Sequence, residues 1–177
     1  PEKNQKIKVG VIGAGNFAST TIIPVLKELR RSCQVLGVSS SGGLSSEALA
    51  KNFKIKNKYS TEDEIFESDE IDAVFILTQH FNHADLVIKG INSGKAVYVE
   101  KPLAIEVDSI TKIEEAMYNA EDPKIFLGFN RRFSKASKFI KEKLNTSPAN
   151  ALNFRFSVPK LDRKSTRLNS SHTVISY

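Results

Sequence analysis

The sequence contains no tryptophan, one methionine and one cysteine, and it has no long apolar run. A single cysteine excludes a disulfide within the chain, and Cys33, at the edge of an apolar stretch, is expected to be a small buried hydrophobic residue. No apolar run approaches the roughly 20 residues that a membrane-spanning helix needs, and the first residues, PEKNQK, lack a hydrophobic signal region. We therefore expect a cytoplasmic protein that does not bind a membrane.

Basic residues outnumber acidic ones, and the formal net charge is +6 at pH 7. A nucleic-acid partner would need this charge to gather around a recognition motif. Three basic residues and one acid, a net +2, lie in Asp162–Tyr177, and the remainder is spread along the chain. The basic stretch Arg131–Lys143 lacks a recognition motif and is predicted to form the solvated face of a helix. We therefore expect no nucleic-acid partner.

A glycine-rich turn is the most informative feature that is present. In Lys8–Ala18, KVGVIGAGNFA, a β-branched apolar stretch leads into the spacing G-x-G-x-x-A of Gly13, Gly15 and Ala18. In dinucleotide-binding turns the first glycine permits the tight turn, the second lets a pyrophosphate approach the backbone, and the small third residue lets helix and strand pack closely. The helix that begins near Asn16 would point its free N–H groups at the phosphates. An ordinary tight turn has the same spacing, but the strand before it and the helix after it favour dinucleotide binding.

Apolar stretches that alternate with helical patterns predict the fold class. Strands are expected at 6–12, 34–39, 58–60, 71–78 and 96–99, and helices at 16–31, 44–53, 61–67 and 81–93. Pro24 should kink or restart the first helix, and Gly94 should stop the last. Because the longer strands are continuous apolar runs, we predict an α/β fold, a doubly wound parallel sheet of Rossmann type with helices on both faces.

The pattern continues after Pro102 into the start of a second domain. A helix is expected at 107–120, the last strand of the sheet at 125–129, and a basic helix that ends near Leu144. The alternation in Leu152–Val158 is typical of a half-exposed antiparallel strand. The predicted organisation is a dinucleotide-binding domain at 1–122, the last strand and an incomplete α+β substrate domain at 123–161, and a tail at 162–177.

The tail has an unusual sequence. Asp162–His172, DRKSTRLNSSH, resembles the translation of a common short-read sequencing adapter. We expect the residues after about Leu161 to be non-native and to form no part of the natural fold. The natural protein is then expected to continue where this chain is cut short. A genuine polar tail is the alternative.

Polar residues follow the second and fourth strands, at the edge where open α/β sheets bind ligands. Proteins that prefer NAD usually carry an acidic residue here, which accepts a hydrogen bond from the ribose 2′-hydroxyl. This chain has Ser39, Ser40 and Ser41 instead. The serines slightly favour NADP and leave the choice between NAD and NADP open. Thr78 follows the fourth strand, and His80 and His83 come next. His83 is predicted either to contact cofactor or substrate, or to cap a helix or bond a backbone group. No Cys or Asp cluster joins the histidines, so no metal site is predicted.

Three motifs together resemble one family. GAGNFA at Gly13–Ala18, VEKP at Val99–Pro102 and GFNRRFS at Gly128–Ser134 occur in the order and at the intervals of the Gfo/Idh/MocA oxidoreductases. The resemblance covers about Lys6–Val158. It implies hydride transfer between NAD or NADP and a sugar, inositol or related polyol, with Lys101 as the catalytic residue near the nicotinamide and the reacting oxygen. The predicted cofactor-binding residues are Gly13, Gly15, Asn16, Phe17, Ala18, Ser39, Ser40, Thr78, His83, Glu100, Lys101, Asn130 and Arg131.

One feature of that family is missing. Its members usually supply a proton-transferring histidine, often with an aspartate nearby, from the second domain, and no stretch before Leu161 matches it. We therefore expect the activity to belong to the longer natural protein from which this chain derives. That protein is expected to be a homo-oligomer or part of a larger fused chain. This chain alone is expected to be inactive. The alternative is a non-catalytic NAD(P)-binding sensor, which would not need Lys101.

Overall fold

The computed structural model describes residues 6–40 and 42–145. The chain divides into two compact units, Pro1–Phe129 and Asn130–Tyr177, and each is treated by itself. The expected strand Leu152–Val158 and the adapter-like tail lie outside the described residues. In the part that is described, no helix is long and apolar enough to cross a membrane.

The first unit is built on a six-stranded parallel sheet with the order β3-β2-β1-β4-β5-β6. The sequence predicts these strands and the parallel sheet, and both are confirmed, with shorter ends for three strands. Strand order reverses on either side of β1, so the chain crosses from one half of the sheet to the other between β3 and β4. The strands are β1 (Ile7–Ile12), β2 (Cys33–Ser39), β3 (Asn57–Tyr59), β4 (Ala73–Ile76), β5 (Ala96–Val99) and β6 (Ile125–Leu127).

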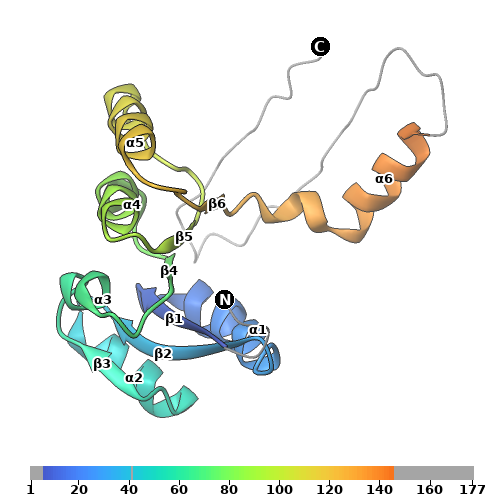
Figure 1. The fold of residues 1–177 in the computed structure, drawn as a ribbon. Coiled ribbons are helices and arrows are strands. Elements are labelled where there is room, and N and C mark those ends of the chain that lie inside the picture. Colours follow the sequence, from blue (N-terminus) through green and yellow to red (C-terminus); the bar gives the residue numbers. More distant parts are fainter. Residues whose placement is uncertain (1–5, 41, 146–177) are drawn as a thin grey trace, which may run out of the picture. The chain divides into compact units, whose positions relative to one another are not determined.

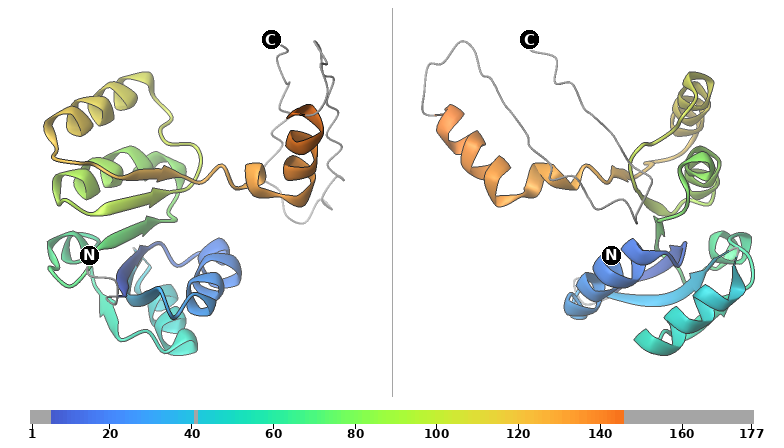
Figure 2. Two further views of the ribbon diagram at one scale, coloured as in Figure 1. Left: turned by 45° about the vertical axis from the view of Figure 1, so that its right-hand side comes forward. Right: turned by 180° about the vertical axis from the view of Figure 1, so that it is seen from behind.

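Helices cover both faces of the sheet, as the continuous apolar strands predict. One core joins buried side chains of the strands to α3 (Asp63–Glu67), α4 (His83–Asn92) and α5 (Val107–Asn119). The other joins Val9, Val11, Val35 and Val38 to α1 (Ile23–Glu28) and α2 (Gly43–Phe53). Figure 1 shows α4 and α5 side by side, and both views in Figure 2 show α1 on the opposite side of the strands. The doubly wound fold is therefore confirmed.

Local sequence signals decide where the helices break. A π-helical segment, Ala18–Ile22, runs without a break into α1, and Pro24, in the first turn of α1, has no N–H to donate to the turn before it. The helix expected at 81–93 is a 3₁₀ turn, His80–Asn82, followed by α4. Gly94, with φ +69°, follows the end of α4, so the predicted stop is confirmed.

Cys33 is buried, as expected, and its Sγ lies 3.5 Å from Leu26 O. Burial raises the pKa of the thiol because the thiolate would be desolvated.

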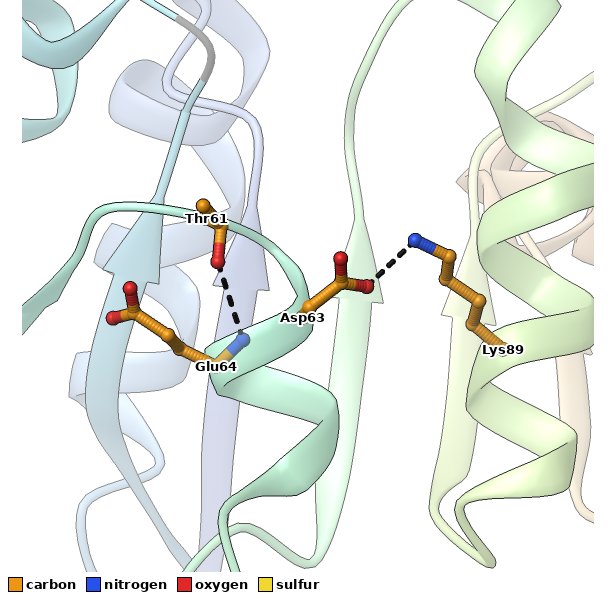
Figure 3. A network of polar contacts seen from close by, with 4 residues as sticks. All are labelled: Thr61, Asp63, Glu64 and Lys89. Carbon is orange, nitrogen blue, oxygen red and sulfur yellow. Dashed lines mark hydrogen bonds and ion pairs between the residues drawn. The ribbon is translucent and has the colours of Figure 1, made fainter.

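Helix α3 is short and is held by polar contacts at its start. Thr61 Oγ1 accepts a hydrogen bond from Glu64 N at 3.4 Å, and Glu64 Oε2 accepts one from Ser60 N at 3.2 Å, so the two side chains cap the turn together. Asp63 accepts a 2.6 Å hydrogen bond from Lys89 Nζ on α4 (Figure 3). Because both charged side chains are exposed, this ion pair contributes little to stability.

Lys95 immediately precedes β5, and its side chain connects two segments of the fold. It is 9% exposed, and Nζ donates to Ser68 O at 2.7 Å and to Ile71 O at 2.9 Å. Desolvation lowers the pKa of Lys95, and the nearby charges of Asp69 and Asp72 oppose that shift. The ammonium group therefore ties the segment after α3 to the beginning of β5.

The second unit is described as far as Asn145. It consists of a 3₁₀ turn, Asn130–Phe133, and α6 (Lys135–Asn145). Ser137 Oγ donates to Arg131 O at 2.8 Å and links the turn to the helix. The predicted basic helix is therefore confirmed, and most of its described side chains are exposed.

Replacing Lys95 with methionine should lower the free energy of unfolding by about 1–3 kcal/mol, because two carbonyl groups lose a charged donor while the apolar stem is kept. Urea denaturation followed by circular dichroism measures the change. Lys89→Met is the matched control, and its exposed ion pair should account for less than about 1 kcal/mol. Equal losses for the two variants would contradict the structural role of Lys95.

Candidate nucleotide-binding site

The carboxyl ends of neighbouring strands lie side by side in this sheet, in the order β2, β1, β4, β5 and β6. Because the strands are parallel, the residues that follow them emerge at one edge of the sheet, where this fold class binds ligands. Backbone hydrogen bonds continue the ladder past the strand ends and fix the level of the loops: Gly13 N to Ser39 O, Leu77 N to Ile12 O, Glu100 N to Ile76 O and Gly128 N to Val99 O.

Gly13 begins the turn after β1 and packs tightly against the end of β4. Its φ of +103° is unfavourable for other residues, and a Cβ built on it would lie 2.6 Å from Leu77 O and 3.0 Å from Thr78 N. No side chain fits between these two backbones. Gly13 is therefore required by the fold itself, as the spacing predicts for the first glycine of the motif.

Gly15 has the opposite environment. It is exposed, and a Cβ built on it would meet no atom within 4 Å. The space above the turn is therefore open, and Gly15 is not needed to pack the ligand-free fold. Such a gap beside a backbone turn is what a pyrophosphate needs for close approach.

The three residues after Gly15 begin the following helix. Asn16 is exposed, Phe17 is 39% exposed, and Ala18 is 1% exposed in the core between helix and sheet. Ala18 is therefore placed for the close helix–strand packing that the motif predicts. Contact of Asn16 and Phe17 with a cofactor stays a prediction.

The serines at the end of β2 are only partly accessible. Ser39 is 1% exposed, and its carbonyl oxygen accepts a 2.8 Å hydrogen bond from Gly13 N. Its side chain is thus in the protein interior rather than at the surface where a ribose would bind. Ser40 is half-buried, and its Oγ lies 3.3 Å from both Gly42 N and Gly42 O. Of the two predicted contacts, Ser40 is the one left near the surface.

Glu100 and Lys101 follow β5 with different exposures. Glu100 is half-buried, and its Oε1 accepts a 2.6 Å hydrogen bond from Tyr98 Oη. Lys101 is exposed, and its backbone N donates to Glu100 Oε2 at 3.4 Å. The Lys101–Pro102 peptide bond is cis. The edge of the sheet therefore carries an ammonium group that solvent, or a ligand, can reach.

The two histidines after β4 differ in the same way. His83 is fully buried, with Nδ1 2.7 Å from Pro102 O and Nε2 3.2 Å from Thr78 O. Of the two roles that the sequence allowed for His83, bonding to the backbone is the one observed. His80 is exposed, and its ring packs edge-on against His83 with centroids 5.5 Å apart.

His80 was not among the predicted binding residues, yet it is the histidine that faces the open edge. The pKa of His80 lies below its ordinary value, first because of partial desolvation and then because His83 and Lys101 lie nearby, while Glu100 opposes the shift. His80 is thus close enough to Lys101 for their charges to interact. Its position in the short loop that follows β4 is the sequence signal that marks it.

Two further predicted residues belong to the second unit. Asn130 and Arg131 begin the second unit and form its first 3₁₀ turn. Their contact with a cofactor stays a prediction. Among the described residues, no group of three or more His, Cys, Asp or Glu side chains is arranged to hold a metal ion.

Comparison with known proteins identifies a family and several relatives that are similar to this chain. The model of an oxidoreductase family with an NAD-binding Rossmann fold, Gfo/Idh/MocA, matches residues 7–127. The inositol 2-dehydrogenase/D-chiro-inositol 3-dehydrogenase of Lacticaseibacillus casei is 29% identical over 141 residues, which are 79% of this chain and 40% of that protein. A trans-1,2-dihydrobenzene-1,2-diol dehydrogenase of Mus musculus is 27% identical over 142 residues, 78% of this chain and 41% of that protein.

A solved structure is similar over the same region. Myo-inositol dehydrogenase from Lactobacillus casei, in complex with NAD(H) and myo-inositol, superimposes with a TM-score of 0.75 at 28% identity, over 80% of this chain and 42% of that one. The chain thus spans about 40% of the length of the curated relatives that it matches. The glycine turn, the strand order and the match over residues 7–127 agree, and the chain belongs to the Gfo/Idh/MocA oxidoreductase family, with its NAD-binding Rossmann fold.

Proposed function

We propose that the protein containing this chain is an NAD(P)-dependent oxidoreductase that transfers hydride between the nicotinamide and a hydroxyl or carbonyl carbon of inositol, a sugar or a related polyol. The observation that carries the proposal is the exposed ammonium group of Lys101 at the sheet edge that also holds the open turn at Gly15. The inositol dehydrogenases among its relatives support a polyol as the substrate. The slight preference for NADP that the serine loop suggests stays a prediction.

The residues present fit a dinucleotide. The open space at Gly15 and the helix start at Asn16 would hold the pyrophosphate, Ser40 would lie near the adenosine ribose, and Thr78 and Lys101 would lie toward the nicotinamide. The nicotinamide supplies or accepts the hydride when bound. The contribution of this chain to the reaction itself is then concentrated in Lys101.

Lys101 can donate a hydrogen bond to the reacting substrate oxygen. Its positive charge stabilises negative charge that develops on that oxygen as hydride leaves the neighbouring carbon. Proton transfer needs a further group, which we expect a second domain of the complete protein to supply. Glu100, held by Tyr98 Oη, fixes the backbone from which Lys101 projects.

A non-catalytic NAD(P)-binding sensor is the second candidate. It would use the same glycine turn, and its activity would not depend on an exposed lysine after β5. The Lys101 variants described below separate the two, because a sensor keeps all its function when Lys101 is lost and the cofactor still binds.

Gly15→Val should abolish binding of NADH to this chain while leaving the free energy of unfolding within about 0.5 kcal/mol, the usual range for a surface substitution. The valine side chain would fill the space that the pyrophosphate needs, and its Cβ would meet no protein atom within 4 Å. Nicotinamide fluorescence titration and urea denaturation measure the two effects. Gly13→Ala is the contrasting variant and should destabilise the fold, since its Cβ would collide with Leu77 O. Unchanged affinity in Gly15→Val would remove the assignment of the pyrophosphate site.

Lys101→Ala should raise the pKa of His80 toward its ordinary value, because a positive charge that disfavours the protonated ring is removed. In the wild type the ring protonates at a pH below the ordinary histidine value, and in the variant this titration moves to higher pH. Nuclear magnetic resonance of the ring protons measures it. Lys95→Met, at the other end of β5, is the control and should leave the titration of His80 in place. An identical titration in Lys101→Ala and wild type would show that the two groups lie too far apart to share a site.

In the complete protein, Lys101→Ala should lower kcat/KM by roughly 10² or more, the usual contribution of such a group, with NAD(P)H affinity within a few-fold of wild type. Lys101→Arg should restore little, because a planar guanidinium does not occupy the position of a compact ammonium. Steady-state kinetics with myo-inositol and other polyols, together with cofactor titration, measure both. Loss of cofactor binding with turnover intact at saturating cofactor would make Lys101 a binding residue and overturn its catalytic role.

A further inference from the structure

Among the described residues that are fully buried, His83 has the largest polar side chain, and it does not reach the open edge of the site. A polar ring in the protein interior destabilises the fold unless its nitrogens find hydrogen-bond partners. Both partners of His83 are backbone carbonyl oxygens, Pro102 O at 2.7 Å and Thr78 O at 3.2 Å. The ring therefore connects the loop after β4 with the loop after β5.

Carbonyl oxygens only accept hydrogen bonds, so the ring nitrogen has to supply the proton in each hydrogen bond that His83 makes here. The shorter contact, at 2.7 Å, assigns an N–H to Nδ1, which donates to Pro102 O. The longer contact of Nε2 with Thr78 O is the weaker one. The principal attachment is thus to the residue that directly follows Lys101.

The backbone on either side of this attachment differs in rigidity. His83 is the first residue of α4, whose buried side chains Ala84, Leu86, Val87 and Ile91 pack into the core. The stretch 101–106 before α5 has no regular secondary structure, and Lys101 and Pro102 are exposed. A contact from a fixed helix to an exposed turn restrains the turn more than the helix.

We propose that His83 is a positioning residue, which holds the Lys101–Pro102 turn at the end of β5 through the Nδ1 hydrogen bond to Pro102 O. Glu100 N, bonded to Ile76 O, restrains the turn on one side, and His83 restrains it on the other. Lys101 lies between these two attachments. This inference rests on the proposed function, because the place that is held matters only if a nicotinamide and a substrate oxygen meet there.

Two conservative variants separate the two contacts of the ring. Asparagine places an amide N–H close to the position of Nδ1, and glutamine places one close to the position of Nε2. His83→Asn should keep the attachment to Pro102 O, whereas His83→Gln should keep only the contact with Thr78 O. His83→Leu, which keeps an apolar group on the buried face of α4, removes both.

The first measurement is hydrogen–deuterium exchange of this chain without any ligand. Residues 101–106 should exchange faster in His83→Leu and His83→Gln than in wild type, while His83→Asn should resemble wild type. The start of β5 near Lys95, at the far end of the sheet, is the internal reference and should not change. Equal exchange of residues 101–106 in wild type and His83→Leu would overturn the attachment whether or not the chain binds a nucleotide.

The second measurement compares titrations with NADH and with ADP-ribose, which has the pyrophosphate but lacks the nicotinamide. His83→Leu and His83→Gln should bind NADH about tenfold more weakly, the size of one lost hydrogen bond, and His83→Asn should recover most of this affinity. ADP-ribose affinity should stay within about twofold of wild type, because the glycine turn is untouched. The loss of a single hydrogen bond would change the affinity by more than this. A purely structural role would weaken both ligands together and overturn the proposal. Wild type that binds neither ligand would instead overturn the proposed function, with the exchange result still deciding the attachment.

Discussion

The contact between the turn at Gly13 and the end of β4 is the constraint on which the rest of the site depends. The two backbones approach so closely that a Cβ at Gly13 would lie 2.6 Å from Leu77 O. This approach exists because β1 and β4 are neighbours at the point where strand order reverses. A larger residue at Gly13 would push the glycine turn away from the loop that carries Thr78 and His80. The open space at Gly15 and the loop after β4 therefore share one edge of the sheet.

The two lysines at the ends of β5 show how position decides the use of one side chain. Lys95 precedes the strand, is buried, and donates to two carbonyl oxygens of the segment after α3. Lys101 follows the strand and is exposed at the ligand-binding edge. In a parallel sheet the chain returns through a helix after each strand, so every carboxyl end reaches the same edge. Residues that precede a strand and residues that follow it therefore lie at opposite edges of the sheet. Charge at one end of β5 stabilises the fold, and charge at the other is available for chemistry.

Much of the fold could be predicted because its signals are local. The continuous apolar strands and the stop at Gly94 each depend on a few neighbouring residues, and they agree with β1 to β6 and with the end of α4. The glycine spacing likewise located the turn, because only glycine accepts the backbone at Gly13. The exposures of individual polar side chains were harder to predict. Ser39 lies in the interior although it begins a run of serines at the end of β2, and the 3₁₀ turn at His80–Asn82 shortens the expected helix.

By itself the sequence determined the α/β class, the dinucleotide turn and the presence of Lys101 after a buried strand, since periodicity, glycine spacing and motif order are properties of the chain alone. Only the tertiary structure decided which of two nearby histidines is buried. His83 is buried because its partners, Thr78 O and Pro102 O, lie five and 19 residues away and meet at its ring only after β4 and β5 have paired. His80, three residues earlier, is left at the open edge near Lys101. Hydrogen bonds between distant segments depend on the folded arrangement, and no local pattern encodes them.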